Sequence, residues 1–159
     1  MYKVLFVCLG NICRSPMAEM IYNQLIRVNN RYDVTRCDSR GLSTLELGNS
    51  IYPQAEQVLT KHNIKVDDHK ADVIKKDDYE NYDIIICMDN ANIDELVNFF
   101  GGDPDNKIHL LMSYADKDEE IEDPWYTGNF DKVYNLIEEG CTSLFKKLVE
   151  KYDNDLLNQ

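Results

Sequence analysis

Two cysteines and an arginine crowd one short stretch, residues 7–16, which reads VCLGNICRSP. Five residues separate Cys8 from Arg14, and Ser15 follows the arginine directly. A cysteine thiolate is a strong nucleophile, and a guanidinium presents a planar set of donors that matches two oxygens of a phosphate. The stretch therefore predicts a nucleophile beside a receptor for a phosphate dianion.

The residues between Cys8 and Arg14 suit a tight turn that binds an anion. Gly10 and Asn11 belong to the residue types that most readily adopt φ > 0. Ser15 can cap the helix that follows, with Pro16 as its first residue. The N-terminus of such a helix directs N–H groups and a partial positive charge toward an anion. These surroundings favour the Cys8 thiolate, to which the Ser15 hydroxyl can donate.

Strands that alternate with helices surround this turn. The apolar run 3–8 predicts a strand that is buried on both faces. Further strands are expected over 32–39, 82–89 and 107–114. Helices are expected from residue 16 to about 28, over 53–62, over 92–100 and from about 129 to 151, with an irregular link that contains one helical turn over 68–82 and an acidic loop over 115–128.

This order of elements predicts an α/β fold with an open four-stranded parallel sheet and helices on both faces. We expect a single domain over residues 1–159, in which residues 152–159 form a frayed tail. Ligands of such folds bind beyond the carboxyl ends of the strands, at the switch point of the sheet. The turn after the first strand occupies that position.

The composition argues against several classes of partner. The net charge of −12 disfavours nucleic acid and anionic membranes. The N-terminal apolar run is too short for a signal peptide, and no segment is long enough to span a membrane, so a cytoplasmic protein is expected. The five cysteines lack a paired spacing, and the three histidines are scattered. We therefore expect no metal, and we expect Cys37, Cys87 and Cys141 to be small buried residues.

The stretch VCLGNICRSP resembles the phosphate-binding loop of the low-molecular-weight protein tyrosine phosphatases. The likeness covers about residues 3 to 150, because DSRGLST, KHNI, DHKADV, CMDNAN and IEDPWY follow in that family's order and spacing. The resemblance implies a cysteine-dependent acid phosphatase without a cofactor. Its substrates would be phosphotyrosine in proteins or peptides and small aryl phosphates. Inorganic phosphate, vanadate and similar oxyanions would inhibit it.

The resemblance also implies roles for single residues. Cys8 would attack phosphorus and form a cysteinyl-phosphate. Asp123 would protonate the leaving phenolate and later activate water. Arg14 and backbone N–H groups would stabilise the equatorial oxygens, and the phosphate-binding residues would be Leu9, Gly10, Asn11, Ile12, Cys13 and Arg14.

Other residues would support this loop or shape the cleft. Asn11, Ser39 and His69 would brace the loop through hydrogen bonds. Asp89 would lie at the edge of the active site or act as the N-cap of a helix. Under oxidation, Cys13 would form a disulfide with Cys8. The cleft residues would be Leu45, Trp125 and Tyr126, where relatives commonly have tyrosine at position 125 and some have a large aromatic at position 45.

Two alternative functions remain open at this point. A thioredoxin-coupled arsenate reductase shares the loop but needs further cysteines to pass a disulfide outward, and none follows Cys87 before Cys141. A non-catalytic phosphotyrosine-binding module would have no need of Cys8 or Asp123. The six carboxylates of residues 116–123 are expected to rim the site and to favour basic residues beside phosphotyrosine.

Overall fold

The computed structural model, which describes residues 1–159, has four strands that form one parallel sheet. The sheet order is β2-β1-β3-β4. The strands are Tyr2–Cys8 (β1), Thr35–Gly41 (β2), Ile84–Cys87 (β3) and Ile108–Leu110 (β4). The expected α/β class and the parallel sheet are confirmed.

The order of the strands creates a switch point at the end of β1. The chain leaves β1 for β2 on one side and later enters β3 on the other side. Cys8 is paired in register with Gly41, and Val7 is paired with Cys87. The loops after β1 and β3 therefore diverge from neighbouring points, which is where open α/β sheets bind ligands.

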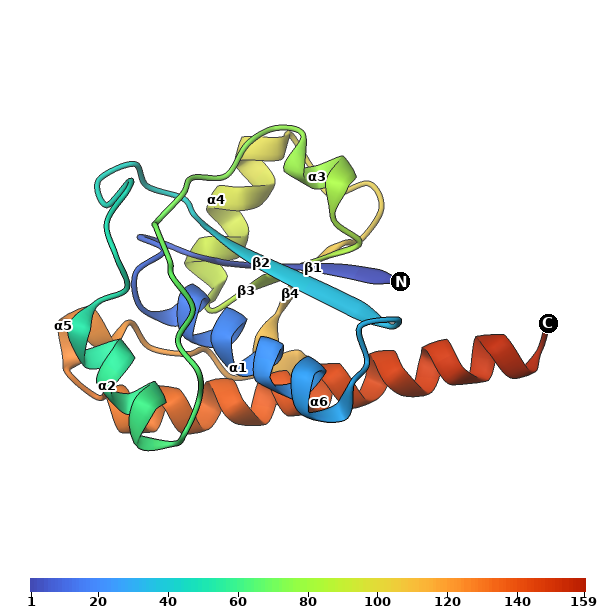
Figure 1. Cartoon of the computed structure of the whole chain (residues 1–159). Coiled ribbons are helices and arrows are strands. Elements are labelled where there is room, and N and C mark those ends of the chain that lie inside the picture. Colours follow the sequence, from blue (N-terminus) through green and yellow to red (C-terminus); the bar gives the residue numbers. More distant parts are fainter.

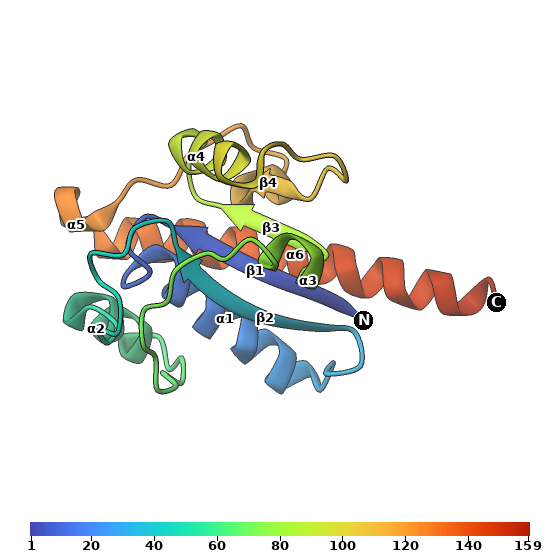
Figure 2. The ribbon, with the colours of Figure 1, turned by 90° about the horizontal axis from the view of Figure 1, so that it is seen from above.

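Helices cover both faces of the sheet (Figures 1 and 2). Val4, Phe6 and Cys8 of β1 belong to the larger apolar cluster, whereas Leu5 and Val7 belong to the smaller one. This alternation explains the continuous apolar run, because both faces of β1 are buried. The larger cluster is covered by Arg14–Asn29 (α1), Pro53–Lys61 (α2) and Phe130–Leu157 (α6), and the smaller one by Asp78–Asn81 (α3) and Asn90–Phe100 (α4).

Several element boundaries differ from the expected ones. Helix α1 begins at Arg14, two residues before Pro16. Pro16 is tolerated there because the N–H groups of a first helical turn have no partner within the helix. The expected strand 107–114 ends at Leu110, and a 3₁₀ helix (η1, Leu111–Ala115) follows. Within the acidic stretch, Pro124–Thr127 form a short helix, α5.

The C-terminal segment is helical as far as Leu157, so the expected frayed tail is wrong for most of its length. Figure 1 shows this end of α6 projecting past the sheet. Tyr152 packs against the larger apolar cluster, and Asp153 forms an ion pair of 2.7 Å with Arg31. These contacts stabilise the last turns of α6, where the local sequence is largely polar. No helix of the chain combines the length and apolar character that crossing a bilayer requires.

Candidate active site

A pocket opens at the carboxyl end of β1, at the switch point of the sheet. Three segments that are distant in the sequence line it: the loop after β1, the loop after β2 and the segment around α5. The lining residues are Cys8, Leu9, Gly10, Ile12, Cys13, Arg14, Ser43, Leu45, Glu46, Asp123, Trp125 and Tyr126. The structure thus brings together the candidate nucleophile, the guanidinium, the candidate acid and the three expected cleft residues.

Donors surround the Cys8 sulfur at the floor of the pocket. The backbone N–H groups of Asn11 and Ser15 donate to Sγ at 3.3 and 3.4 Å. The Ser15 hydroxyl lies 3.0 Å from the same sulfur. Because Asn11 Nδ2 donates to Ser15 Oγ at 2.8 Å, the hydroxyl hydrogen of Ser15 is free to point at Cys8. The Cys8 sulfur can therefore accept three hydrogen bonds.

Asn11 holds the loop through nearly all of its polar atoms. Its φ of 58° makes it the left-handed residue of the turn, whereas Gly10 does not adopt positive φ, contrary to expectation. Asn11 Oδ1 accepts from the N–H of Asp72 at 3.0 Å, and Nδ2 donates to Ser39 Oγ at 2.9 Å as well as to Ser15. Its carbonyl oxygen lies 2.7 Å from His69 Nε2. The expected bracing residues therefore all contact the loop.

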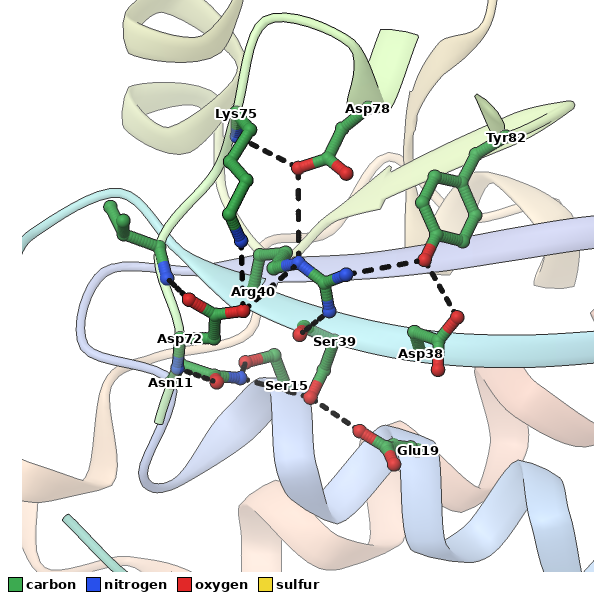
Figure 3. A network of polar contacts seen from close by, with 11 residues as sticks. Asn11, Ser15, Glu19, Asp38, Ser39, Arg40, Asp72, Lys75, Asp78 and Tyr82 are labelled. Atoms are coloured by element: carbon green, nitrogen blue, oxygen red, sulfur yellow. Dashed lines mark hydrogen bonds and ion pairs between the residues drawn. The ribbon is translucent and has the colours of Figure 1, made fainter. Parts of the chain in front are cut away.

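A larger polar network continues from Asn11 along β2 (Figure 3). Ser39 Oγ donates to the Glu19 carboxylate at 2.5 Å, and burial raises the pKa of Glu19. Asp72 pairs with Lys75 at 2.9 Å on the other side of Asn11. Sequence reasoning missed Glu19, although it lies one helical turn after Ser15 and on the same face of α1.

Gly41 is required by the close approach of the loop. A Cβ atom at Gly41 would lie 3.1 Å from Asn11 Cβ, from the Gly10 carbonyl carbon and from the Leu9 oxygen. Because two of these neighbours are backbone atoms, a larger residue would displace the loop itself. The end of β2 thus fixes how close the loop can pack.

Arg14 connects the loop to two carboxylates from other segments. Its Nη1 donates to Asp89 Oδ2 at 2.7 Å and to the Ile121 carbonyl oxygen at 2.8 Å, and its Nη2 lies 3.6 Å from Asp123 Oδ2. Burial lowers the pKa of Arg14, but nearby Cys8, Asp89 and Asp123 outweigh that effect and raise the pKa overall. The guanidinium is therefore a permanent cation at the base of the pocket.

The two acids that contact Arg14 each cap a helix. Asp89 accepts from the N–H of Asn92 at 2.8 Å as the N-cap of α4, so its two expected positions, site edge and cap, coincide. Asp123 accepts from the N–H of Trp125 at 3.1 Å as the N-cap of α5. These bonds hold both carboxylates toward the guanidinium.

The remaining cysteines differ in their access to the pocket. Cys13 lines it, and burial, together with nearby Cys8 and Asp123, raises the pKa of its thiol to about 12. Cys13 is therefore a neutral thiol at pH 7. Cys87 and Cys141 are fully buried, as expected, whereas Cys37 is only partly buried and donates to Asn23 Oδ1 at 3.3 Å.

The carboxylates of the acidic stretch 116–123 are expected to rim the site, and most of them do not. Only Asp123 of its carboxylates lines the pocket. Three others contact the rest of the protein: Glu122 pairs with Lys132, Asp116 pairs with Lys147, and Glu120 accepts from the N–H of Asn90. The second carboxylate of the pocket is Glu46, which sequence reasoning missed although it follows Leu45 directly.

Comparison with known proteins finds matches over nearly the whole chain. Residues 3–154 match the family model of the low molecular weight phosphotyrosine protein phosphatases. The low molecular weight protein-tyrosine-phosphatase YfkJ of Bacillus subtilis is 36% identical over 150 residues, which cover 93% of this chain and 96% of the relative. PtpA of Staphylococcus aureus is 34% identical over 94% of this chain and 96% of its own length.

Solved structures give the same result. The crystal structure of YfkJ from Bacillus subtilis matches with a TM-score of 0.91 and 37% identity, over 95% of this chain and 96% of that one. The crystal structure of DARP, a drosophila arginine phosphatase, matches with a TM-score of 0.80 and 35% identity, over 92% of this chain and 97% of that one. This chain belongs to the low molecular weight phosphotyrosine protein phosphatase family.

Proposed function

We propose that this protein hydrolyses phosphotyrosine and small aryl phosphates through a cysteinyl-phosphate intermediate. One observation carries the proposal: the Cys8 sulfur, with three donors around it, shares a pocket with the Arg14 guanidinium and the Asp123 carboxyl group. A nucleophile, an anion receptor and an acid within one pocket meet the geometric requirements of phosphoryl transfer.

In the first step, the Cys8 thiolate attacks phosphorus in line with the leaving group. The N–H groups of residues 9–14 and the Arg14 guanidinium stabilise the equatorial oxygens. The bond between phosphorus and the phenolic oxygen breaks, and Asp123 gives its proton to that oxygen. The products of this step are a tyrosine side chain and a cysteinyl-phosphate.

In the second step, the Asp123 carboxylate takes a proton from a water molecule as the water oxygen attacks phosphorus. The bond between sulfur and phosphorus breaks, inorganic phosphate leaves, and Cys8 returns to the thiolate. Ser15 stabilises that thiolate as the leaving group. Inorganic phosphate and vanadate would bind the same loop and therefore inhibit.

The walls of the pocket suit an aromatic substrate. Leu45, Trp125 and Tyr126 are exposed at its mouth. Large apolar side chains of this kind seldom remain exposed together unless they contact a ligand or a partner. A phosphotyrosine ring could lie between them while its phosphate reaches the loop, and the relatives YfkJ and PtpA carry the name protein-tyrosine-phosphatase.

The arsenate reductase alternative fits less well. That chemistry needs thiols that accept a disulfide in turn and carry it to the surface. Cys87 and Cys141 are fully buried and lie outside the pocket, so neither can meet an external reductant. The five free thiols suit a reducing compartment, and we propose that the protein works in the cytoplasm.

The test is hydrolysis of p-nitrophenyl phosphate, phosphotyrosine and phosphoarginine by the wild type and by Cys8→Ser. We expect vanadate-sensitive turnover of the two aryl phosphates by the wild type. In Cys8→Ser we expect no turnover but retained vanadate binding, since a serine hydroxyl does not ionise as a thiol does. Turnover by Cys8→Ser would exclude the covalent mechanism, and a preference for phosphoarginine would exclude the aryl substrate class.

A further inference from the structure

Tyr52 contacts both the phosphate-binding loop and the segment that carries Asp123. Its backbone N–H donates to the Ile12 carbonyl oxygen at 2.9 Å. Its ring meets the Trp125 ring edge-on, with the two centroids 4.9 Å apart and the planes at 73°. The same ring stacks parallel to the Phe130 ring, with the centroids 5.9 Å apart and the planes at 5°. Tyr52 therefore lies between the loop, α5 and the start of α6.

Helix α5 needs such a contact to keep its place. It has only four residues, Pro124–Thr127, which is too short to be stable alone. The Trp125 side chain is half exposed and that of Tyr126 is 76% exposed. Both views of the ribbon place α5 and α2 at the same end of the molecule (Figures 1 and 2). The Tyr52 ring is the aromatic contact that α5 makes with this neighbouring segment.

The position of Trp125 determines the position of the candidate acid. The Trp125 N–H donates to Asp123 Oδ1, and only Pro124 separates the two residues. A shift of the Trp125 ring would therefore turn the carboxyl group that caps the same helix. We propose that Tyr52 is a positioning residue that acts through Trp125 to hold the Asp123 carboxyl group at its working distance from the phosphate loop. This inference rests on the proposed function, in which Asp123 is the general acid.

The test compares Tyr52→Ala with Tyr52→Phe on two leaving groups. An aromatic pair of this kind corresponds to a factor of about 3 to 10 in an equilibrium. We expect Tyr52→Ala to lower kcat for phosphotyrosine by about that factor and kcat for p-nitrophenyl phosphate by less than about twofold, because the better leaving group needs less protonation. Tyr52→Phe keeps the ring and should match the wild type on both substrates.

A second readout reports the contact itself. Trp125 is the single tryptophan of the chain, so its fluorescence follows α5 directly. Loss of the Tyr52 ring should uncover the indole and increase its quenching by acrylamide, and Tyr52→Phe should not. His62→Ala is the matched control: His62 follows α2, stacks on Tyr134 of α6 at 3.9 Å and does not line the pocket. It should change neither quenching nor the ratio of the two substrates.

The outcomes separate this inference from the proposed function. An active wild type whose Tyr52→Ala variant keeps both the substrate ratio and the quenching would overturn the role of Tyr52 alone. Equal losses of kcat on both substrates, with unchanged quenching of Trp125, would mean that Tyr52 has only a structural role. That result would also overturn the proposed positioning role. A wild type without phosphatase activity would overturn both proposals. If Tyr52→Ala does not fold, Tyr52→Leu keeps an apolar side chain against Phe130 and gives the same comparison.

Discussion

Arg14 Nη2 lies 3.6 Å from Asp123 Oδ2, so the cation that would bind phosphate also contacts the group that would protonate the leaving phenolate. Arg14 also donates to the Ile121 carbonyl oxygen at 2.8 Å, so it connects the loop after β1 to the segment before α5 at two points. A phosphate dianion bound to Arg14 would therefore lie beside the Asp123 carboxyl group. One guanidinium would thus contact both the substrate phosphate and the proposed acid.

Replacement of Asp123 by Asn should impair turnover in proportion to the basicity of the leaving group. The phenolate of tyrosine, whose parent pKa is near 10, needs a proton as the bond to phosphorus breaks. We expect kcat for a phosphotyrosine peptide to fall by roughly 10² to 10⁴. The loss with p-nitrophenyl phosphate should be smaller, and peptide binding should persist, so that the variant acts as a substrate trap. Steady-state kinetics on both substrates measure the difference.

Equal losses on the two substrates would contradict the assignment of Asp123. Asp89 would then be the next candidate, because it is the other carboxylate in contact with Arg14.

Two substitutions of Asp89 should distinguish the effect of its ion pair with Arg14 from the effect of its N-cap bond on α4. Asp89→Ser can still cap α4 but cannot pair with Arg14, whereas Asp89→Ala loses both interactions. A hydrogen bond between charged groups corresponds to roughly 1.5–3 kcal/mol, so we expect both variants to lose about 10- to 100-fold in kcat/KM. Asp89→Ala should in addition be less stable than Asp89→Ser by about 1 kcal/mol. Kinetics and thermal melting measure the two effects, and wild-type kcat/KM in Asp89→Ser would argue against a role for the ion pair.

Cys13 should protect the nucleophile from irreversible oxidation. Peroxide converts the Cys8 thiolate to a sulfenic acid, and attack by the Cys13 thiol then forms a disulfide and releases water. Both sulfur atoms lie in the same loop, and the Cys13 thiol, which its raised pKa keeps protonated at pH 7, must give its proton to the departing hydroxide as the S–S bond forms. We expect dithiothreitol to restore most activity to peroxide-treated wild type and much less to Cys13→Ser. Equal recovery of the two proteins would show that no protective disulfide forms.

Glu46 should give the pocket its preference for basic peptides. It is the carboxylate at the mouth that has no partner cation, and the Asn49 amide holds it by a hydrogen bond of 2.7 Å. An exposed pair of charges contributes up to about 1 kcal/mol, so we expect the preference for basic over acidic flanking residues to drop about two- to fivefold in Glu46→Gln. The preference of the wild type should also weaken at high salt. A peptide panel measures the effect of the substitution and the effect of salt. An unchanged preference in Glu46→Gln would show that other residues set it.

Glu122 should stabilise the segment that carries Asp123, and this stabilisation should depend on pH. Hydrogen bonds from Lys132, and then from Thr127 and Asn129, lower the pKa of Glu122 from 4.5 to about 2. The unfolded chain therefore binds this proton more readily, so the stabilisation is complete above the unfolded pKa and is lost as the pH falls toward about 2. Thermal melting of Glu122→Gln should show a lower Tm than the wild type at pH 7 and a narrowing gap between pH 5 and pH 3. A gap that is independent of pH would contradict this account.

Local sequence by itself determined the chemistry at the end of β1. An apolar run buried on both faces, a turn residue that tolerates φ > 0 and a helix start directly afterwards are short-range features, and they place Cys8, Arg14 and Ser15 around one anion site. The alternation of strands and helices, which is also a local pattern, determined that the sheet is parallel. These properties depend on backbone conformation and burial within a few residues.

Only the tertiary structure decided which distant groups meet that loop. The chain has 29 acidic residues, and apart from the family resemblance, which singles out Asp89 and Asp123, nothing local distinguishes Glu46, Asp89 and Asp123 from the rest. The sheet order β2-β1-β3-β4 brings the ends of β1 and β3 together, and the packing of Tyr52 against Trp125 and Phe130 brings α5 to the same place. The tertiary structure also decided the length of α6, whose last turns depend on Tyr152 and on the Arg31–Asp153 pair. Such contacts join residues far apart in the chain, so their positions follow from the packing of whole elements, which local sequence patterns do not encode.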